Sequence, residues 1–338
     1  SSAKDLQGGG FNLVPNFHLV APVNDSIAFA FGVTVPFGLK TDFKSSDWNV
    51  IVPAFKTLAA PTVTQIMGIN FNPSLSYKIF PNFALAVGLD VLDASADYDV
   101  STDGLDFTGT LNNHLTGWGV GYNVGLLYSL NDSTRVGLNY RSGISVKATG
   151  YSEMKSSNRI SAAKATLDLP GSFLLSGSHR FDQHWDGLVS VQYTTWSVLK
   201  NLQIDGVVDP ISTTTKTIKS NLNYRNTWFF ALGTNYYLNK KWSFSLGAGY
   251  DQTPTQDGYR DLRLPGSNRY VAAIGAHWNP YSFMKVDAAY QHIFTGKAKI
   301  DSSKRKDIST SGDFISYADG TAKMDVNLIG LAVNFTFD

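Results

Sequence analysis

The chain has 338 residues, a net charge of +1 and no cysteine, and only 16% of its residues are charged. The near-neutral balance gives no electrostatic reason to expect nucleic acid as a partner, and the lack of cysteine excludes disulfides, thiolate metal sites and cysteine nucleophiles. No apolar run approaches the roughly 18 residues that a spanning helix needs, and no signal-peptide pattern opens the chain. A membrane β-barrel remains, because its spans are hidden in alternation.

Alternation with period two is the main pattern of the sequence. Trp118 and Val120 fall on one face of a strand and Gly119 and Gly121 on the other, and the segment 242–251 repeats this division. Thirteen strands are predicted in chain order, at residues 11–23, 27–35, 63–79, 83–99, 117–130, 134–150, 164–181, 185–204, 219–238, 241–251, 268–279, 283–300 and 323–337.

The connections between these strands alternate in length. Short ones lie at 23–26, 80–82, 131–133, 182–184, 239–241 and 279–282, and long ones at 36–62, 100–116, 151–163, 205–218, 252–267 and 301–322. An antiparallel barrel inserted from one side produces this order, with short turns on the periplasmic rim and long loops outside. A soluble β-sandwich has no reason to sort its loops in this way. The sequence therefore predicts an all-β fold, a transmembrane antiparallel β-barrel that forms a single domain over residues 1–338.

Six tryptophans lie near predicted strand ends or on apolar faces, where the aromatic girdles of a barrel form, although any one of them also fits a buried core. They are Trp118, Trp185, Trp196, Trp228, Trp242 and Trp278.

Thirteen is an odd number for a barrel, because bacterial single-chain barrels usually have an even count that puts both termini on one side. The last predicted strand runs toward the periplasm, and the turn at 23–26 then places residues 1–10 outside. We therefore expect that an upward strand before Ser1 is absent from this chain.

Nine short blocks of the sequence resemble the FadL family of outer-membrane long-chain fatty acid transporters, and they occur in the family's order over essentially the whole chain. They are V-P-N-F-H-L-V-A-P-V-N-D (14–25), P-F-G-L-K-T-D-F (36–43), L-L-Y-S-L-N (126–131), N-Y-R-S (139–142), L-D-L-P-G-S (167–172), Y-T-T-W-S (193–197), A-L-G-T-N-Y-Y (231–237), Y-D-Q-T-P (250–254) and L-P-G-S-N-R-Y (264–270).

The resemblance implies a monomeric fourteen-stranded barrel in the bacterial outer membrane, with an N-terminal hatch that closes the lumen. Neither the hatch nor the first strand is found in this sequence, in agreement with the odd count. The implied function is passive uptake of hydrophobic small molecules, most of all long-chain fatty acids. Relatives that import monoaromatic hydrocarbons provide the alternative substrate class.

Pro36 and Gly38 are unusual residues for a strand, because proline cannot donate to the ladder and glycine leaves a gap in the wall. From the residues alone, Pro36 ends the strand and starts a loop. The resemblance instead implies an inward kink at Pro36, Phe37 and Gly38, through which substrate leaves sideways into the bilayer. Both interpretations remain open at this point.

The long connection after this segment has an apolar tip, which suggests either a surface that captures hydrophobic substrate or a segment folded onto the barrel mouth. Its candidate capture residues are Trp48, Ile51, Val52, Phe55 and Leu58.

A fatty acid carboxylate would need a cation in the lumen, and Lys219 and Arg225 are the candidates on the predicted strand 219–238. The resemblance aligns the family's carboxylate-binding lysine with Ser220 and its second basic ligand with Val100, so this chain departs from the pattern at both positions. A charge on the solvated rim is an equally good interpretation of Lys219 and Arg225.

Other functions find less support in the sequence. The six histidines show no metal-ligand spacing and no evident serine or aspartate partner, so we expect no metal, no cofactor and no enzyme activity. A general porin would need charges of both signs in its lumen.

The basic run 302–307 suits either lipopolysaccharide phosphates or solvent. The outer loops 100–116 and 151–163 are shorter than the family's.

Overall fold

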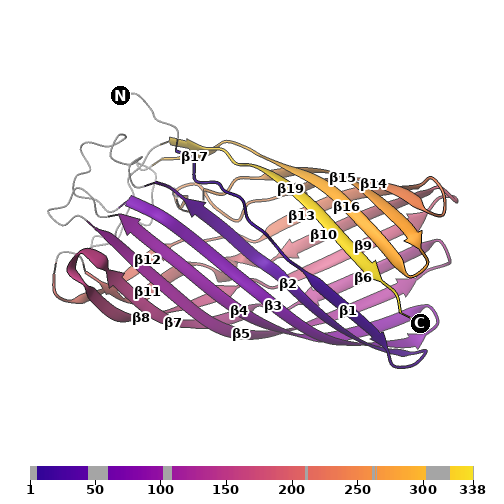
Figure 1. Ribbon diagram of the computed structural model, residues 1–338, viewed down its shortest axis with the longest axis horizontal. Helices are drawn as coiled ribbons and strands as arrows, with labels where there is room; N and C mark the ends of the chain where they lie inside the picture. The colour runs from indigo at the N-terminus through magenta and orange to yellow at the C-terminus, as the bar shows by residue number, and fades with distance from the viewer. Residues whose placement is uncertain are drawn as a thin grey trace.

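Strands make up nearly all the regular structure of the computed structural model, which describes residues 6–44, 60–101, 109–209, 212–260, 263, 265–301 and 320–337 (Figure 1). The only helical turns in these ranges are two single 3-10 turns, η2 (Lys155–Ser157) and η3 (Trp196–Val198). Accordingly, no helix in the described ranges is long and apolar enough to cross a membrane.

The strands follow one another along the chain and form an antiparallel β-barrel. They are β1 (Phe17–Pro22), β2 (Ile27–Asp42), β3 (Ala60–Phe80), β4 (Phe83–Ser101), β5 (Thr110–Ser129), β6 (Thr134–Arg141), β7 (Ile144–Met154), β8 (Arg159–Leu169), β9 (Ser172–Arg180), β10 (Trp185–Thr194), β11 (Asn201–Val208), β12 (Thr215–Asn221), β13 (Thr227–Tyr237), β14 (Trp242–Asp251), β15 (Arg269–Tyr281), β16 (Met284–Thr295), β17 (Ala298–Ile300), β18 (Gly320–Ala322) and β19 (Asp325–Phe335).

Four strands of the wall are each broken in two at mid-length, giving the pairs β6/β7, β8/β9, β10/β11 and β12/β13. The lower halves continue the wall from β5 through β6, β9, β10 and β13 to β14. The upper halves pair separately, in the order β5, β7, β8, β11 and β12. The predicted barrel fold is confirmed, and each of the thirteen predicted strands has a counterpart.

Some predicted boundaries are wrong. The strand predicted at 27–35 continues to Asp42, and the one predicted at 11–23 begins only at Phe17. The predicted long loop 151–163 is mostly strand, because β7 and β8 approach each other as a hairpin and only η2 and Asn158 separate them. Asn158 takes the left-handed conformation (φ 52°) that this tight reversal requires.

Aromatic side chains form two rows on the outer face of the barrel. Near the short turns, Trp242 stacks on Trp278 with ring centroids 5.8 Å apart, and farther up the same strands Tyr250 meets Tyr270 at 5.2 Å. The rows are eight residue steps apart, or about 26 Å along the strand, which at a tilt of about 40° is a height of roughly 20 Å and comes close to the ~25 Å apolar band of outer-membrane barrels. Leu246 is 60% exposed between them, as a lipid-facing side chain must be.

The outer faces of the upper halves of the broken strands are polar, which indicates that these halves extend beyond the apolar band. Asp205 of β11 is one such residue, and it accepts hydrogen bonds from Thr217 (2.8 Å) and Gln203 (2.9 Å). These hydrogen bonds hold the pKa of the Asp205 carboxyl below its usual value. The neighbouring β8 contributes Lys164, which faces Asp205 across the strand pair. We therefore place this part of the wall in the extracellular water.

The wall has a seam between β1 and β19. The antiparallel pairings lead from β1 through twelve steps to β19, so these two strands run in the same direction, as Figure 1 also shows. Within the described residues no pairing joins β1 to β19.

Glycines on the inner face of β5 let β7 step inward over it. A Cβ at Gly117 would lie 2.5 Å from the carbonyl oxygen of Lys147 and 2.8 Å from the Cα of Ala148. A Cβ at Gly125, lower on the same face, would meet nothing closer than 3.7 Å. The upper wall can therefore lean into the lumen because Gly117, together with Gly119 and Gly121 on the same face, has no side chain.

Replacing Gly117 with alanine should destabilise the barrel by about 2 kcal/mol, because the backbone of β7 must move to admit the methyl group. The measurement is the temperature at which the barrel loses its heat-modifiable, folded mobility in SDS gel electrophoresis and runs as the unfolded protein. Gly125→Ala is the matched control and should leave that temperature nearly unchanged. Equal temperatures for the two variants would contradict this account of the inward step.

Candidate functional site

A β-bulge interrupts the ladder between β2 and β3 in the segment that contains Pro36. Thr34 pairs with Asn70 and Phe37 pairs with Gly68, so two residues of β2, Val35 and Pro36, face one residue of β3. The strand then continues to Asp42. The interpretation of Pro36 as the end of the strand is therefore wrong.

The edge of β2 that faces away from β3 has few backbone hydrogen bonds beside the bulge. β1 pairs with β2 only as far as Phe17 with Val33. Beyond Val33, the described residues show one backbone hydrogen bond on this side, from Asp42 to the carbonyl of Gly8 (2.9 Å). The bulge therefore lies where the wall is held mainly from one side.

Side chains around the bulge point in opposite directions. Pro36 and Gly38 are exposed, whereas Phe37 turns inward. Gly68 lies beside this ring and beside Leu92, since a Cβ at Gly68 would lie 3.6 Å from the Phe37 ring, an ordinary contact, and a tighter 3.1 Å from the Leu92 side chain. Inside the lumen, Phe37 meets Trp196 edge-to-face with centroids 6.3 Å apart. Trp196 therefore belongs to the lumen, and its predicted place in an outer girdle is wrong.

Apolar side chains fill the lumen above this point in two clusters. One packs Leu92, Ile144, Val146, Leu167, Leu169 and Leu199, with Ala94, and Phe37, Trp196 and Tyr224 lean against it. The second, farther up, is built around Leu111, Met154, Val207 and Val208, all buried to within 1% exposure. A cavity of about 50 Å³ lies among residues of both clusters, and Tyr98, Leu115, Val146, Leu167, Leu202 and Ile204 are among its lining residues.

The lumen wall becomes polar just below the clusters. Asp90 of β4 is fully buried, and its carboxylate accepts hydrogen bonds from the amides of Asn70 (2.7 Å), Asn72 (3.3 Å) and Asn123 (2.9 Å). Arg141 adds an ion pair at 3.6 Å. These partners offset much of the cost of burying the charge. The residue after next, Leu92, already belongs to the apolar part.

A second polar network lies on the opposite wall. The Ser245 hydroxyl is 2.6 Å from Nε2 of His277, and Nδ1 of His277 is 2.6 Å from Asp287. No serine or aspartate partner for a histidine is evident in the sequence, because these residues lie on three neighbouring strands that only the barrel brings together. The order resembles that of serine hydrolases, but β14 is paired on both edges, so the backbone N–H of Ser245 serves the ladder rather than an oxyanion.

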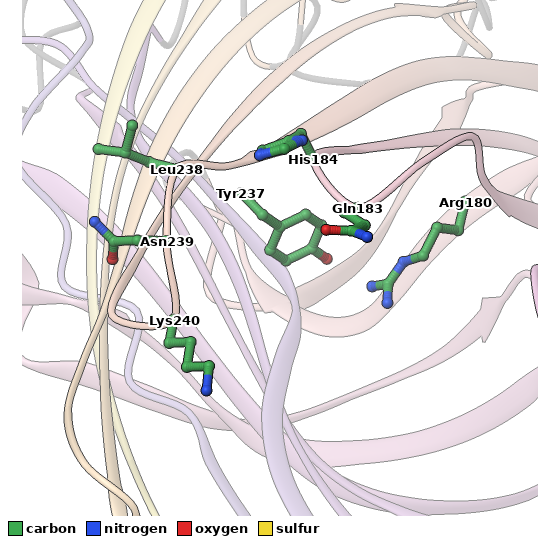
Figure 2. A pocket seen from close by; sticks show the side chains of 7 residues that line it. All are labelled: Arg180, Gln183, His184, Tyr237, Leu238, Asn239 and Lys240. Atoms are coloured by element: carbon green, nitrogen blue, oxygen red, sulfur yellow. The ribbon is translucent and has the colours of Figure 1, made fainter.

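Charges also line the short-turn rim, where a pocket of about 290 Å³ opens (Figure 2). Arg180 forms an ion pair with Asp186 at 3.0 Å, and the Tyr237 hydroxyl donates to the same carboxylate at 2.7 Å. The Arg180 guanidinium lies over the Tyr237 ring, 5.2 Å from its centroid, and Figure 2 shows Lys240 in the same pocket. The lower lumen is therefore polar down to its mouth.

The two predicted cations both have exposed side chains. Lys219 is exposed on β12, and Arg225 is exposed after it, with its Nε donating to the carbonyl of Thr253 (3.3 Å). Their neighbour Ser220 is buried, and it accepts a hydrogen bond from Arg263 at 2.8 Å.

Arg263 is a residue that the sequence did not single out. It also donates to the Tyr98 hydroxyl at 3.2 Å and lies over the Tyr98 ring at 5.6 Å. Its carbonyl accepts from Thr41 of β2 at 3.0 Å, so this residue joins β2, β4 and β12 across the upper lumen. The segment containing it reads as a loop, and only the folded chain brings it to Ser220.

The proposed capture residues Trp48, Ile51, Val52, Phe55 and Leu58 lie outside the described residues, as does the basic run 302–307.

An outer-membrane β-barrel whose lumen is apolar above and polar below, with a break in one wall strand, fits a transporter of hydrophobic compounds. The family model for "Outer membrane protein transport protein (OMPP1/FadL/TodX)" matches residues 2–337. The chain therefore belongs to this family of transporters, which are not enzymes, and its place is the bacterial outer membrane.

Relatives carry names of different kinds. The chain is 28% identical to outer membrane protein P1 of Haemophilus influenzae, over all of this chain (100%) and 77% of that protein. It is 28% identical to the long-chain fatty acid transport protein of Escherichia coli O6:H1, over 82% of this chain and 69% of that protein.

Solved structures share the fold. A FadL homologue of Pseudomonas aeruginosa matches with a TM-score of 0.79 at 22% identity, covering 95% of this chain and 78% of that one. The toluene transporter TodX of P. putida matches with a TM-score of 0.68 at 13% identity, covering 96% of this chain and 83% of that one.

Replacing Asp90 with asparagine should destabilise the barrel by about 3 kcal/mol, since it removes a buried charge that three amides and Arg141 surround. The free energy of unfolding in urea, measured in lipid vesicles, checks this. Asp132→Asn, in an exposed turn, is the control and should change little. A variant at Asp90 as stable as this control would show that the network contributes nothing.

Proposed function

We propose that this protein takes up hydrophobic small molecules passively, most of all long-chain fatty acids, and releases them sideways into the bilayer beside Pro36, Phe37 and Gly38. The observation that carries the proposal is the β-bulge at Pro36. It breaks the ladder at the height where an apolar lumen gives way to a polar one, and Phe37 leads from the bulge into the apolar cluster.

The change of lining decides the direction of exit. Moving an alkyl chain from apolar surroundings into water costs about 0.8 kcal/mol for each CH₂ group. Passage downward would bring the chain against Asp90, His277 and Arg180, all in polar networks. Passage sideways at Phe37 keeps it next to apolar groups, first in the lumen and then in lipid. The lateral route is therefore the one of lower free energy.

Capture would take place at the extracellular mouth. There we assign the first contact to the apolar loop with Trp48, Ile51, Val52, Phe55 and Leu58, and contact with lipopolysaccharide to the outer surface. The protein would act as a monomer.

Fatty acids are favoured over aromatic hydrocarbons by the position of Arg263. Its guanidinium lies at Tyr98, a residue that also lines the apolar cavity. A carboxylate there would gain a charge-assisted hydrogen bond while its chain remained among apolar side chains. The names of two relatives indicate different substrates, because one is a long-chain fatty acid transport protein and the other is a toluene transporter. Monoaromatic hydrocarbons therefore remain the second candidate, and a general porin is less favoured because the upper lumen is filled with apolar groups.

Replacing Gly38 with tryptophan should lower fatty acid uptake severalfold, because an indole on the exposed side of the bulge would cover the proposed exit. A Cβ at Gly38 meets only Val35, at 3.7 Å, so the fold should tolerate the change. Labelled oleate uptake into cells is the measurement. Gly177→Trp is the matched control, since Gly177 also faces outward, on β9. Equal uptake by both variants would rule out the exit at this position.

Replacing Arg263 with methionine should weaken fatty acid binding about tenfold, by the loss of one charge-assisted hydrogen bond, and leave toluene binding unchanged. Binding of labelled oleate and toluene to the purified barrel provides the measurement. Lys219→Met is the comparison, because Lys219 is exposed on the same part of the wall. A parallel loss of both ligands in Arg263→Met would point to a role in structure alone.

A further inference from the structure

The apolar cavity in the upper lumen contains two polar atoms that lack hydrogen-bond partners. They are the hydroxyl Oγ1 of Thr64 and the side-chain carbonyl Oδ1 of Asn113, and both residues line the cavity. Thr64 is 8% exposed and Asn113 is 1% exposed, so both side chains are buried. Within the described part of the chain, each is an unsatisfied group in a largely apolar space.

Strand register explains how they come to the same cavity. Thr64 of β3 pairs with Tyr98 of β4, which pairs in turn with Asn113 of β5, so the three form one row across the inner face. The Asn113 amide nitrogen donates to the carbonyl oxygen of Tyr98 at 2.7 Å, which fixes the side chain and leaves Oδ1 directed elsewhere. Arg263 meets the row at the Tyr98 hydroxyl.

A buried polar atom without a partner destabilises a protein, and the few that occur mark places where something else completes the hydrogen bonds. Asn113 Oδ1 can only accept a hydrogen bond, and Thr64 Oγ1 can accept or donate. A hydroxyl group suits both, because it carries a proton to donate and lone pairs to accept. A carboxylate has no proton to offer Asn113, and an alkane offers nothing to either residue.

We propose that this cavity is a binding site for alkyl compounds that carry a hydroxyl group, hydroxylated fatty acids included, and that Thr64 and Asn113 recognise the hydroxyl. The inference rests on the proposed function, because the cavity lies on the route from the mouth to Phe37. It adds a preference within the hydrophobic substrates that neither the family nor the relatives' names supply.

The volume of the cavity favours an aliphatic group. About 50 Å³ is available. This is room for roughly four water-sized atoms, whereas a benzene ring occupies an engineered cavity of about 150 Å³. A hydroxyl with the few carbons next to it therefore fits without rearrangement of the clusters, and an aromatic ring does not.

Three ligands with the same number of heavy atoms test the proposal: 1-octanol, heptyl methyl ether and nonane. Binding of each radiolabelled ligand to the purified barrel is measured in detergent and corrected for uptake by micelles alone. The wild-type protein should bind 1-octanol about tenfold more tightly than the ether, as expected for one additional buried hydrogen bond. Nonane should bind no better than the ether.

Two variants locate the recognition. Thr64→Val keeps the shape and removes a hydroxyl that has no partner, so the fold should persist. Asn113→Leu removes Oδ1 together with the bond to Tyr98, so its folded state is checked by heat-modifiability. At least one of them should reduce the preference for 1-octanol over the ether to nearly one. Thr116→Val, on the exposed face of β5, should keep the preference.

An equal affinity of the wild-type protein for all three ligands would overturn the proposal and leave the proposed function intact. So would a preference for 1-octanol that persists in both variants. If none of the three ligands bound while labelled oleate did, the proposal would fail and the proposed function would stand; if oleate did not bind either, both would fail.

Discussion

A strand in a lipid-facing wall must pair its backbone N–H and C=O groups, because the bilayer core offers them no other partners. In β2 the ladder is interrupted at the bulge, and the residue there is Pro36, which has no N–H to pair. The bulge at Val35 and Pro36 therefore leaves fewer unsatisfied groups than the same bulge would with any other residue, and the strand resumes its ladder at Phe37. The rest of the proposed mechanism depends on this position. The break can lie in the wall because proline makes it tolerable there, and Phe37, one residue later, connects it with the lumen.

The lumen determines what such a break can do. Above Phe37 the interior holds leucine, isoleucine and valine side chains from strands that step inward, and below it the wall carries Asp90, the Ser245–His277–Asp287 network and the rim pair of Arg180 with Asp186. Two features of β5 and its neighbours create this division. Gly117 lets the upper wall approach, and Asp90 holds three amides directly beneath the apolar cluster. A hydrophobic molecule that enters from outside thus meets favourable surroundings only as far as the height of the bulge.

Much of the fold could be predicted from the sequence, because alternation and turn residues are local signals. The alternation around Trp118 and Val120 predicts a lipid-facing strand from that segment alone, whatever the other strands are. Period two also tells which residues share a face, but it does not tell which of them meet. Ser245, His277 and Asp287 lie on separate strands, so only the register brings them together. Trp196 has the sequence features of a girdle residue, yet η3 turns it into the lumen, and Arg263 comes from a segment without any period at all. For Pro36, the residues alone favoured the end of a strand, because the pairing that continues past it depends on β3.

The central claim is that hydrophobic substrate leaves the barrel sideways at the bulge and does not descend through the polar lumen. A fatty acid with a photoreactive group at the end of its chain tests this most directly, when cells carrying the protein are illuminated during uptake and the labelled residues are identified by mass spectrometry. The account predicts labels on Phe37, Gly38 and the facing residue Gly68, and none on Asn123, Ser245 or Tyr237. Labels along the lower lumen, with none at the bulge, would show that the substrate passes through the barrel toward the short-turn rim and would contradict the lateral route.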